Sequence, residues 1–133
     1  MNFEAALTQE LKTIVALQNR VYPLAAPEAT AGNGVPYLIY GSSDGLRTKT
    51  LDGYQSGRLV QGEINIIAAR YGDMKSITTY VVELLIGMER RVIGTNGPFI
   101  QELTYRQPVE LYEQAPNLYR CLIDFEVYFD QGG

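Results

Sequence analysis

Two carboxylates near the end of the chain, Asp124 and Glu126, form the closest approach to a catalytic pair in this sequence. Their spacing places both side chains on one face of a β-strand, because successive side chains leave a strand on opposite faces. Two such acids could serve a glycosidase or bind a hard cation. Acids on a solvated strand face are far more often simply hydrated, so we expect Asp124 and Glu126 to be surface charges.

Other reactive groups are scarce. The sequence contains no His, which excludes a His-dependent triad or zinc site. The single Cys121 falls on the apolar face of a predicted strand, so we expect a small buried hydrophobic residue rather than a nucleophile. The pairs Gly32, Gly34 and Gly94, Gly97 lack the Lys and Ser or Thr that follow a phosphate-binding loop. We therefore predict no catalytic residue, no cofactor, no metal site and no enzymatic activity.

The composition indicates an ordinary globular protein. Hydrophobic residues make up 46% and charged residues 20% of 133 residues, which fits one domain over residues 1–133. Because 11 Lys and Arg stand against 15 Asp and Glu, the net charge of -4 argues against nucleic-acid binding as a bulk property. The sequence has no leader pattern and no apolar run of about 20 residues, so we expect no membrane contact and no export.

Residues 117–130 show the alternation of a half-buried β-strand, and we expect the rest of the fold to pack around it. The apolar side of this strand carries Tyr119, Cys121, Ile123, Phe125, Val127 and Phe129. The polar side carries Arg120, Asp124, Glu126 and Asp130. Apolar side chains in such a row are stable only when they pack against other apolar side chains, so we expect the rest of the chain to cover this side of the strand.

Two segments have the helical spacing of apolar residues. Residues 2–19 form the first, with Asn2 as its N-cap. Residues 73–89 form the second, with Asp73 as its N-cap. The stripe of the first helix consists of Phe3, Leu7, Leu11, Ile14 and Val15. The stripe of the second consists of Met74, Ile77, Val81, Leu84, Leu85 and Met88, which we expect to lie on the sheet.

Three further strands are predicted over residues 37–43, 58–69 and 99–107, with a short extended piece at 109–112. The third strand is expected to turn Phe99, Leu103 and Tyr105 inward. These elements predict an α+β fold in one domain, with a mostly antiparallel sheet of about four strands and two helices on one face. The other face would be polar and open, with Gln61, Glu63, Asn65, Glu102, Thr104, Asp124 and Glu126 on it.

Two connections interrupt the pattern. Residues 22–36 are rich in Pro and Gly, so we expect a long connection without regular structure for most of its length. Residues 43–57 contain two turn signals around a polar arm and form either a protruding hairpin or a flexible loop. The cations on or beside this arm are Arg47, Lys49 and Arg58, against Asp44 and Asp52. They could contact an acidic partner or merely keep a loop soluble.

The order of landmarks resembles the tail-completion proteins of long-tailed bacteriophages and prophages, also called tail-terminator or head-to-tail joining proteins. The matching residues are Val21, Tyr22, Pro23, Leu24, Ala26, Pro27, Pro36, Tyr37, Tyr40, Thr50, Leu51, Asp52, Gly53, Tyr112, Glu113, Pro116, Leu118, Tyr119 and Arg120. The resemblance implies a structural virion protein, assembled in the host bacterial cytoplasm. It implies a ring, typically a hexamer, at the head-proximal end of the tail tube, joined to the head connector or head-completion protein and open for DNA to pass.

The arm is where we expect subunit or tail tube contacts. The residues concerned are Arg47, Lys49, Thr50, Leu51, Asp52, Gly53, Tyr54 and Arg58. A different class of function also fits the sequence, namely a protein-binding module, such as an adaptor or inhibitor. As a monomer or dimer, such a module would use its Tyr-rich sheet, since Tyr joins an apolar ring to a polar tip.

Overall fold

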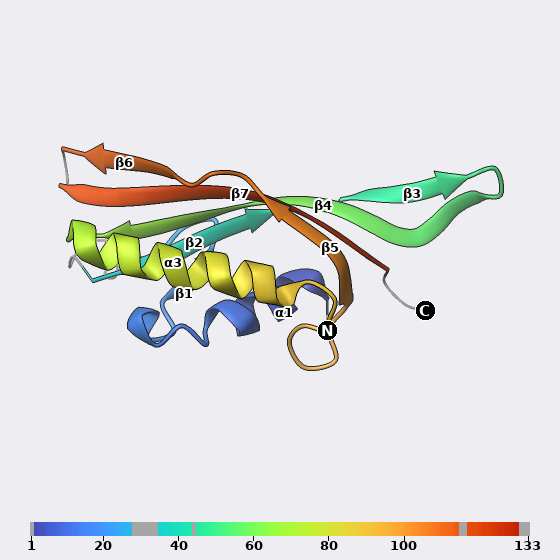
Figure 1. The fold of residues 1–133 in the computed structure, drawn as a ribbon, viewed down its shortest axis with the longest axis horizontal. Coiled ribbons are helices and arrows are strands. Elements are labelled where there is room, and N and C mark those ends of the chain that lie inside the picture. The colour runs from blue at the N-terminus through green and yellow to red at the C-terminus, as the bar shows by residue number, and fades with distance from the viewer. Residues whose placement is uncertain (1, 28–34, 44, 115–116, 131–133) are drawn as a thin grey trace.

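The computed structural model describes residues 2–27, 35–43, 45–114 and 117–130. The described residues form a seven-stranded sheet with two α-helices on one of its faces (Figure 1). In chain order the elements are α1 (Phe3–Leu11), the 3-10 turn η1 (Val15–Leu17), β1 (Val21–Pro23), β2 (Tyr37–Ser42), β3 (Leu46–Thr50), β4 (Gly53–Ala68), α3 (Tyr71–Met88), β5 (Phe99–Tyr105), β6 (Val109–Glu113) and β7 (Leu118–Asp130).

The strands lie in the order β1-β2-β4-β7-β5, with β3 added beside β4 and β6 beside β7. All neighbours are antiparallel except β1 and β2. The predicted α+β class is confirmed, but the expected number of about four strands is wrong. The strands that were not counted have weak patterns: β1 has 3 residues, β3 is almost wholly exposed, and β6 is an exposed edge segment.

β7 is the central strand of the core, as its alternation predicts. It pairs with β4 on one side and with β5 and β6 on the other. Its predicted apolar face is buried from Cys121 to Phe129. The ring of Phe125 lies over Gly62 of β4, where a Cβ atom would collide with it. The glycine therefore makes room for a large side chain inside a central strand.

α1 begins where predicted, because the Asn2 side chain accepts a hydrogen bond of 2.8 Å from a first-turn backbone N–H. It ends at Leu11, however, so the helix predicted over residues 2–19 is wrong in its second half. Gln18 and Asn19 have φ angles of 47° and 65°, which a right-handed helix cannot contain. Val15, expected in the apolar stripe, is exposed at the start of η1.

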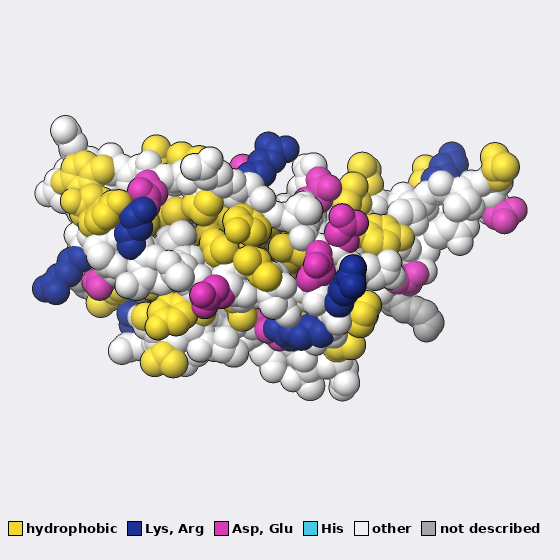
Figure 2. Space-filling model, in the orientation of Figure 1, with side chains coloured by type: hydrophobic (Ala, Val, Ile, Leu, Met, Phe, Trp, Pro, Cys, Tyr) yellow, Lys and Arg dark blue, Asp and Glu magenta, His cyan; other side chains and the backbone are white. Residues whose placement is uncertain are grey.

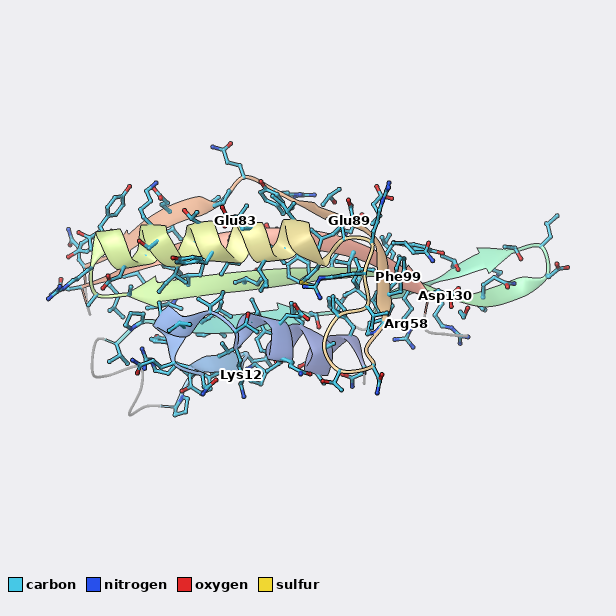
Figure 3. All side chains as sticks on the ribbon, turned by 60° about the horizontal axis from the view of Figure 1, so that its bottom comes forward. Lys12, Arg58, Glu83, Glu89, Phe99 and Asp130 are labelled. Carbon is cyan, nitrogen blue, oxygen red and sulfur yellow. The ribbon has the colours of Figure 1, made fainter. Side chains whose placement is uncertain are left out.

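α3 begins at Tyr71 with Arg70 as its N-cap, so the prediction of Asp73 as N-cap is wrong. Asp73 lies in the first turn, where the helix dipole still favours a carboxylate. The predicted stripe is buried except for Leu84, which is partly buried against the core. Both helices lie on the same side of the sheet (Figure 3). Neither, among the described residues, combines the length and apolar character of a membrane span.

β5 contains an irregularity that makes its predicted face wrong at Phe99 only. The register against β7 shifts between Ile100 and Glu102. As a result Ile100 is buried, and Phe99, which was predicted to point inward, is 46% exposed. Beyond the shift Leu103 is buried as predicted, and Tyr105 lies opposite Phe125 on the same face, where it is 38% exposed beside α3. A bulge of this kind changes which side chains point inward, so a strict two-residue period fails across it.

A charged clasp holds α1 to the loop after α3. Glu10 accepts hydrogen bonds from the Arg91 guanidinium at 2.6 and 3.1 Å and from the Gly94 N–H at 2.8 Å. The hydrogen bond from Arg91 holds the pKa of Glu10 below its ordinary value of 4.5, and the Gly94 N–H acts in the same direction, against burial. The carboxylate is therefore the form that fits the folded chain.

The connection over residues 22–36 begins with regular structure, because β1 pairs in parallel with β2 and the Leu24 N–H donates to the Tyr40 carbonyl at 2.9 Å. Gly32 and Gly34 of this connection lie outside the described residues. So do Asp44 of the predicted turn and Pro116.

Candidate functional site

β3 and the first part of β4 form a hairpin that projects beyond the rest of the sheet (Figure 1). Thr50 pairs with Gly53 across the turn at residues 51–52, and Gly53 has a φ of +107°, which glycine adopts without strain. In the described chain, the pairing of β4 with β7 begins only at Gly57. The predicted arm thus ends in a hairpin that reaches past the core of the molecule.

The hairpin tip is organised by its own polar groups. The Thr50 hydroxyl accepts hydrogen bonds from the Asp52 N–H at 3.2 Å and from the Gln55 side chain at 3.1 Å. Leu51 at the turn is fully exposed, and Tyr54 is 64% exposed. A preformed turn that presents apolar side chains to solvent is typical of a contact surface.

Cross-strand pairing places the cations of the arm on one face. Arg47 lies opposite Arg58, and Lys49 lies opposite Tyr54 with its Nζ 5.0 Å from the ring centroid. The register shifts between the two pairs, but Arg47 and Lys49 are two positions apart and Tyr54 and Arg58 are four apart, so an even spacing keeps both pairs on one face. We call Arg47, Lys49, Tyr54 and Arg58 the cationic hairpin face. Arg47 and Lys49 are exposed on this face, so their charge favours an acidic partner here.

The structure brings the predicted contact residues together on this one hairpin. They are Arg47, Lys49, Thr50, Leu51, Asp52, Gly53, Tyr54 and Arg58. Arg58 lies nearest the body of the molecule, in a cleft that Val60 and Phe129 also line.

The base of the hairpin is fixed by contacts that sequence reasoning missed. Gly57 lies under the Tyr128 hydroxyl and the Thr48 side chain, and a Cβ atom there would collide with both. The Ser56 hydroxyl donates to the Asp130 carboxylate at 2.6 Å. Gly57 falls at the end of the predicted arm, just before the strand predicted over residues 58–69, so its pattern gave no signal of this close approach.

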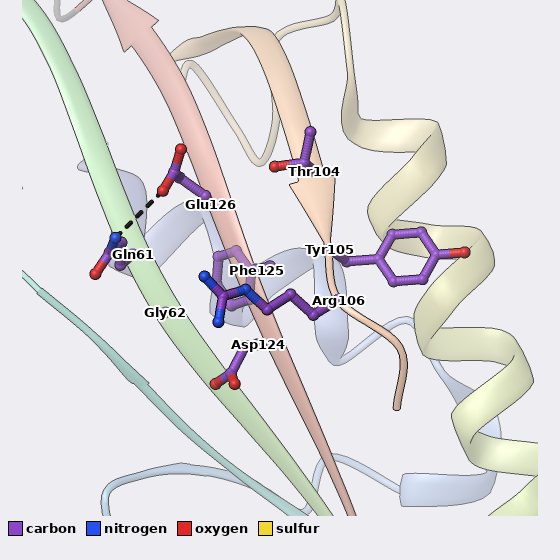
Figure 4. Close-up of a pocket in the computed structure, with 8 residues that line it drawn as sticks. All are labelled: Gln61, Gly62, Thr104, Tyr105, Arg106, Asp124, Phe125 and Glu126. Atoms are coloured by element: carbon purple, nitrogen blue, oxygen red, sulfur yellow. Dashed lines mark hydrogen bonds between the residues drawn. The ribbon is translucent and has the colours of Figure 1, made fainter. Parts of the chain in front are cut away.

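The open face of the sheet is hollowed over β4 and β7 (Figure 4). A groove of about 510 Å³ adjoins a second of about 540 Å³, and the two share Gln61, Gly62 and Asp124. Together they are lined by the carboxylates of Glu63, Asp124 and Glu126 and by the guanidinium of Arg106. We call the two grooves the acidic trough.

Asp124 and Glu126 share this face as predicted. Glu126 accepts a hydrogen bond of 3.2 Å from the Gln61 side chain. The Arg106 side chain extends over β7 toward β4 (Figure 4), and the backbone N–H of Arg106 donates to the backbone carbonyl of Asp124 at 2.9 Å. Within the described residues, no group of three or more His, Cys, Asp or Glu side chains is placed to hold a metal ion. The arrangement suits attraction of a cationic surface.

Cys121 is wholly buried on the core side of β7, as expected. Burial raises the pKa of its thiol, although a hydrogen bond with Thr78 acts in the opposite direction. A thiol held in this protonated state has the character of a core side chain.

An apolar groove between α3 and β5 is a further surface that the sequence did not indicate. Ile86, Leu103 and Tyr105 line it, and the Glu89 carboxylate at its edge accepts from the Leu103 N–H at 2.9 Å. Figure 2 shows hydrophobic side chains gathered in this region. Ile86, which lies off the predicted stripe of α3, is 55% exposed.

The fold and the hairpin define a small α+β protein with a projecting arm. The family model described as tail completion protein gp17 matches residues 5–130. The chain belongs to this family of bacteriophage tail proteins, and the resemblance inferred from the sequence is confirmed. It is a structural component of the tail.

Solved structures show the same fold. A chain in the virion of a native gene transfer agent particle is similar with a TM-score of 0.68 at 18% identity, over 96% of this chain and 94% of that one. A second solved chain is similar with a TM-score of 0.57 at 17% identity, over 98% and 92%. A comparison with curated protein sequences gave no significant match.

Proposed function

We propose that copies of this protein form a ring, most simply a hexamer, at the head-proximal end of a tail tube. The ring terminates the tube, joins it to the head connector or head-completion protein, and leaves a channel for DNA. The observation that carries the proposal is the hairpin, which presents Leu51 and Tyr54 beyond the chain's own core. Because these side chains lie beyond the core of their own subunit, only a neighbouring molecule can bury them.

The edges of the sheet support contacts between copies. β1 is one edge of the sheet, and β6 and the end of β5 are the other; the start of β5 is covered by the backbone of residues 90–92, and no further strand pairs with β1 or β6 in the described part of the chain. Open edges recruit other chains, and heterologous contacts between identical subunits close into rings. The tail tube protein and the head connector then bind the two ends of the ring.

The charge of the chain suits a DNA channel. With a net charge of -4, a ring of this protein does not bind phosphates strongly as a whole, because such affinity comes from clustered cations. DNA therefore passes without specific binding. On this proposal the protein is assembled in the host bacterial cytoplasm and resides in the neck of the virion.

The groove between α3 and β5 favours a second candidate, a protein-binding module that acts as a monomer or dimer. Its exposed Ile86 and Tyr105 would be the anchors for a partner. Ile86→Glu separates the two functions. It abolishes partner capture by a module, and it leaves a ring built through the hairpin intact.

Electron microscopy of isolated tail tubes mixed with the protein tests the ring. We expect a cap of fixed rotational symmetry at one tube end, and mass measurement over a range of concentrations should show whether the ring also forms in solution. Leu51→Asp should remove the cap. Val15→Asp, a matched change at an exposed residue on η1, should leave it in place. A protein that stays monomeric and leaves tube ends bare contradicts the proposal.

A further inference from the structure

Two surfaces of the molecule carry opposite charge and face opposite sides of the sheet. Arg58 shares a cleft with Val60 and Phe129 on the side that the helices cover, and Arg47 lies opposite it on β3. Asp124 and Glu126 alternate with the buried residues of β7 and so project from the open side.

A single copy cannot bring these two surfaces together. Tyr54, opposite Lys49, precedes Gln61 by seven positions, and Gln61 pairs with Glu126. At about 3.4 Å per residue, the two places lie roughly 24 Å apart along β4. β4 runs as one strand of 16 residues from Gly53 to Ala68, so the chain has no turn at which the arm could fold back.

We propose that the cationic hairpin face of one copy docks into the acidic trough of the next copy. This contact rests on the proposed ring and names the surface that receives the hairpin. The exposed cations that would enter the trough are Arg47 and Lys49, and the carboxylates of the trough are Glu63, Asp124 and Glu126. Because the two surfaces differ, the contact is heterologous and repeats from copy to copy until the ring closes.

A second copy fits the hairpin better than a nucleic acid does. Asp52 at the turn would repel phosphates, and the exposed Leu51 would gain nothing from them. A protein trough instead offers carboxylates for the cations and apolar surface for Leu51 and Tyr54. The trough's own Arg106 lies beside Asp124 and would leave room for a neighbour's cation mainly near Glu63 and Glu126.

Charge reversal on each surface tests the docking. The hairpin variant is Arg47→Glu with Lys49→Glu, and the trough variant is Glu63→Lys with Glu126→Lys. Each alone should lower the fraction of protein in rings by about tenfold or more, since like charges across an interface are strongly unfavourable. Lys12→Glu and Glu83→Lys reverse exposed charges elsewhere and should leave assembly unchanged (Figure 3).

An equimolar mixture of the two variants gives the decisive result. A reversed hairpin then meets a reversed trough, and a native hairpin meets a native trough, so the two variants should form rings in which they alternate. Native mass spectrometry measures their ratio, which should be one to one. A chain that carries all four changes should also assemble.

Several outcomes would overturn the docking. If native protein forms rings and the trough variant assembles equally well, the hairpin binds another surface and only the ring survives. If the hairpin variant fails and neither the mixture nor the combined chain restores assembly, the partner is not this trough, and DNA binding by the hairpin is then measured directly. If native copies form only dimers or open chains that respond to charge reversal as described, the docking holds and the ring fails. If native copies do not associate at all, both are wrong.

Discussion

The two parts of β4 have the same backbone conformation and opposite roles. From Val60 to Ala68 its inward side chains are buried and it has a strand on each side, β2 and β7. From Gly53 to Ser56 it pairs only with β3 among the described strands, and its side chains are largely exposed. One strand therefore runs from the centre of the core into solvent.

The two parts of β4 therefore differ in what they contribute: the inner part stabilises the fold, and the outer part presents exposed surface. Burial of a large apolar side chain contributes about 1.5–3 kcal/mol, so the inner part of β4 is stabilised by its layer of side chains. The outer part has a cation-π contact and a few turn hydrogen bonds, each a small contribution. Changes in the inner part should thus alter stability, and changes in the outer part should alter assembly.

Phe125→Ala should have the largest effect. The ring is 3% exposed and fills the space above Gly62, so its removal leaves a cavity beside β4. We expect a loss of about 3–5 kcal/mol in the free energy of unfolding, measured by denaturant titration. Tyr54→Ala, an aromatic truncation on the outer part of the same strand, is the control and should cost far less. Equal losses would mean that the hairpin belongs to the folding core.

Gly62→Ala adds a methyl group at the same place. The new Cβ would meet the Phe125 ring, so the ring must move, and we expect a loss of about 1–3 kcal/mol by thermal or denaturant unfolding. Combining the change with Phe125→Leu should recover part of the loss, because the smaller side chain leaves room for the methyl group. Full additivity of the two changes would contradict direct contact.

The contrast within β4 was only partly predictable from sequence. Alternation placed Val60 and Ile64 in the core correctly, because burial on one face leaves a two-residue period. It failed in β5, where the bulge after Ile100 changes the face, since a bulge leaves no mark in residue type. The positive φ at Gln18 was equally invisible, so α1 was predicted too long.

The surfaces of the candidate site were also only partly predictable from sequence. The turn around Gly53 and the cations of the arm are local signals, so the hairpin residues could be named from sequence. The acidic trough depends on Gln61, Thr104 and Asp124 coming together from β4, β5 and β7, and the groove beside Ile86 depends on how α3 lies on β5. Such surfaces follow from tertiary packing, which no short pattern encodes.

Glu10→Gln tests the charged clasp between α1 and the loop after α3. This contact lies in the body of the molecule, and its loss should cost less stability than the changes at Phe125 and Gly62. Because the Arg91 side chain is 42% exposed, solvent screens the pair, and we expect a loss of about 1 kcal/mol at neutral pH. The pKa of Glu10 is lowered by folding, so its contribution is complete above the ordinary value of 4.5 and declines as pH falls through the lower folded pKa.

The variant should therefore differ from the native protein most at neutral pH and approach it in stability as the pH falls below 4.5 and through the lower folded pKa of Glu10. Urea titrations at several pH values measure this difference. Glu83→Gln, a matched change on the exposed face of α3, should show no such convergence. A difference that is constant with pH would show that the clasp acts through shape rather than charge.

Arg47→Glu with Lys49→Glu should have the smallest effect on stability, within about 0.5 kcal/mol, since both side chains are exposed. The exchange places a carboxylate opposite Arg58 but removes the contact of Lys49 with the Tyr54 ring, so these small effects offset each other and the melting temperature should hardly change. The same variant should fail to complete tails. A protein that keeps its melting temperature as it stops assembling would show that these cations are retained for contact with a neighbour. Parallel loss of melting temperature and tail completion would instead place the hairpin in the folding core, and the division of β4 into two parts would be wrong.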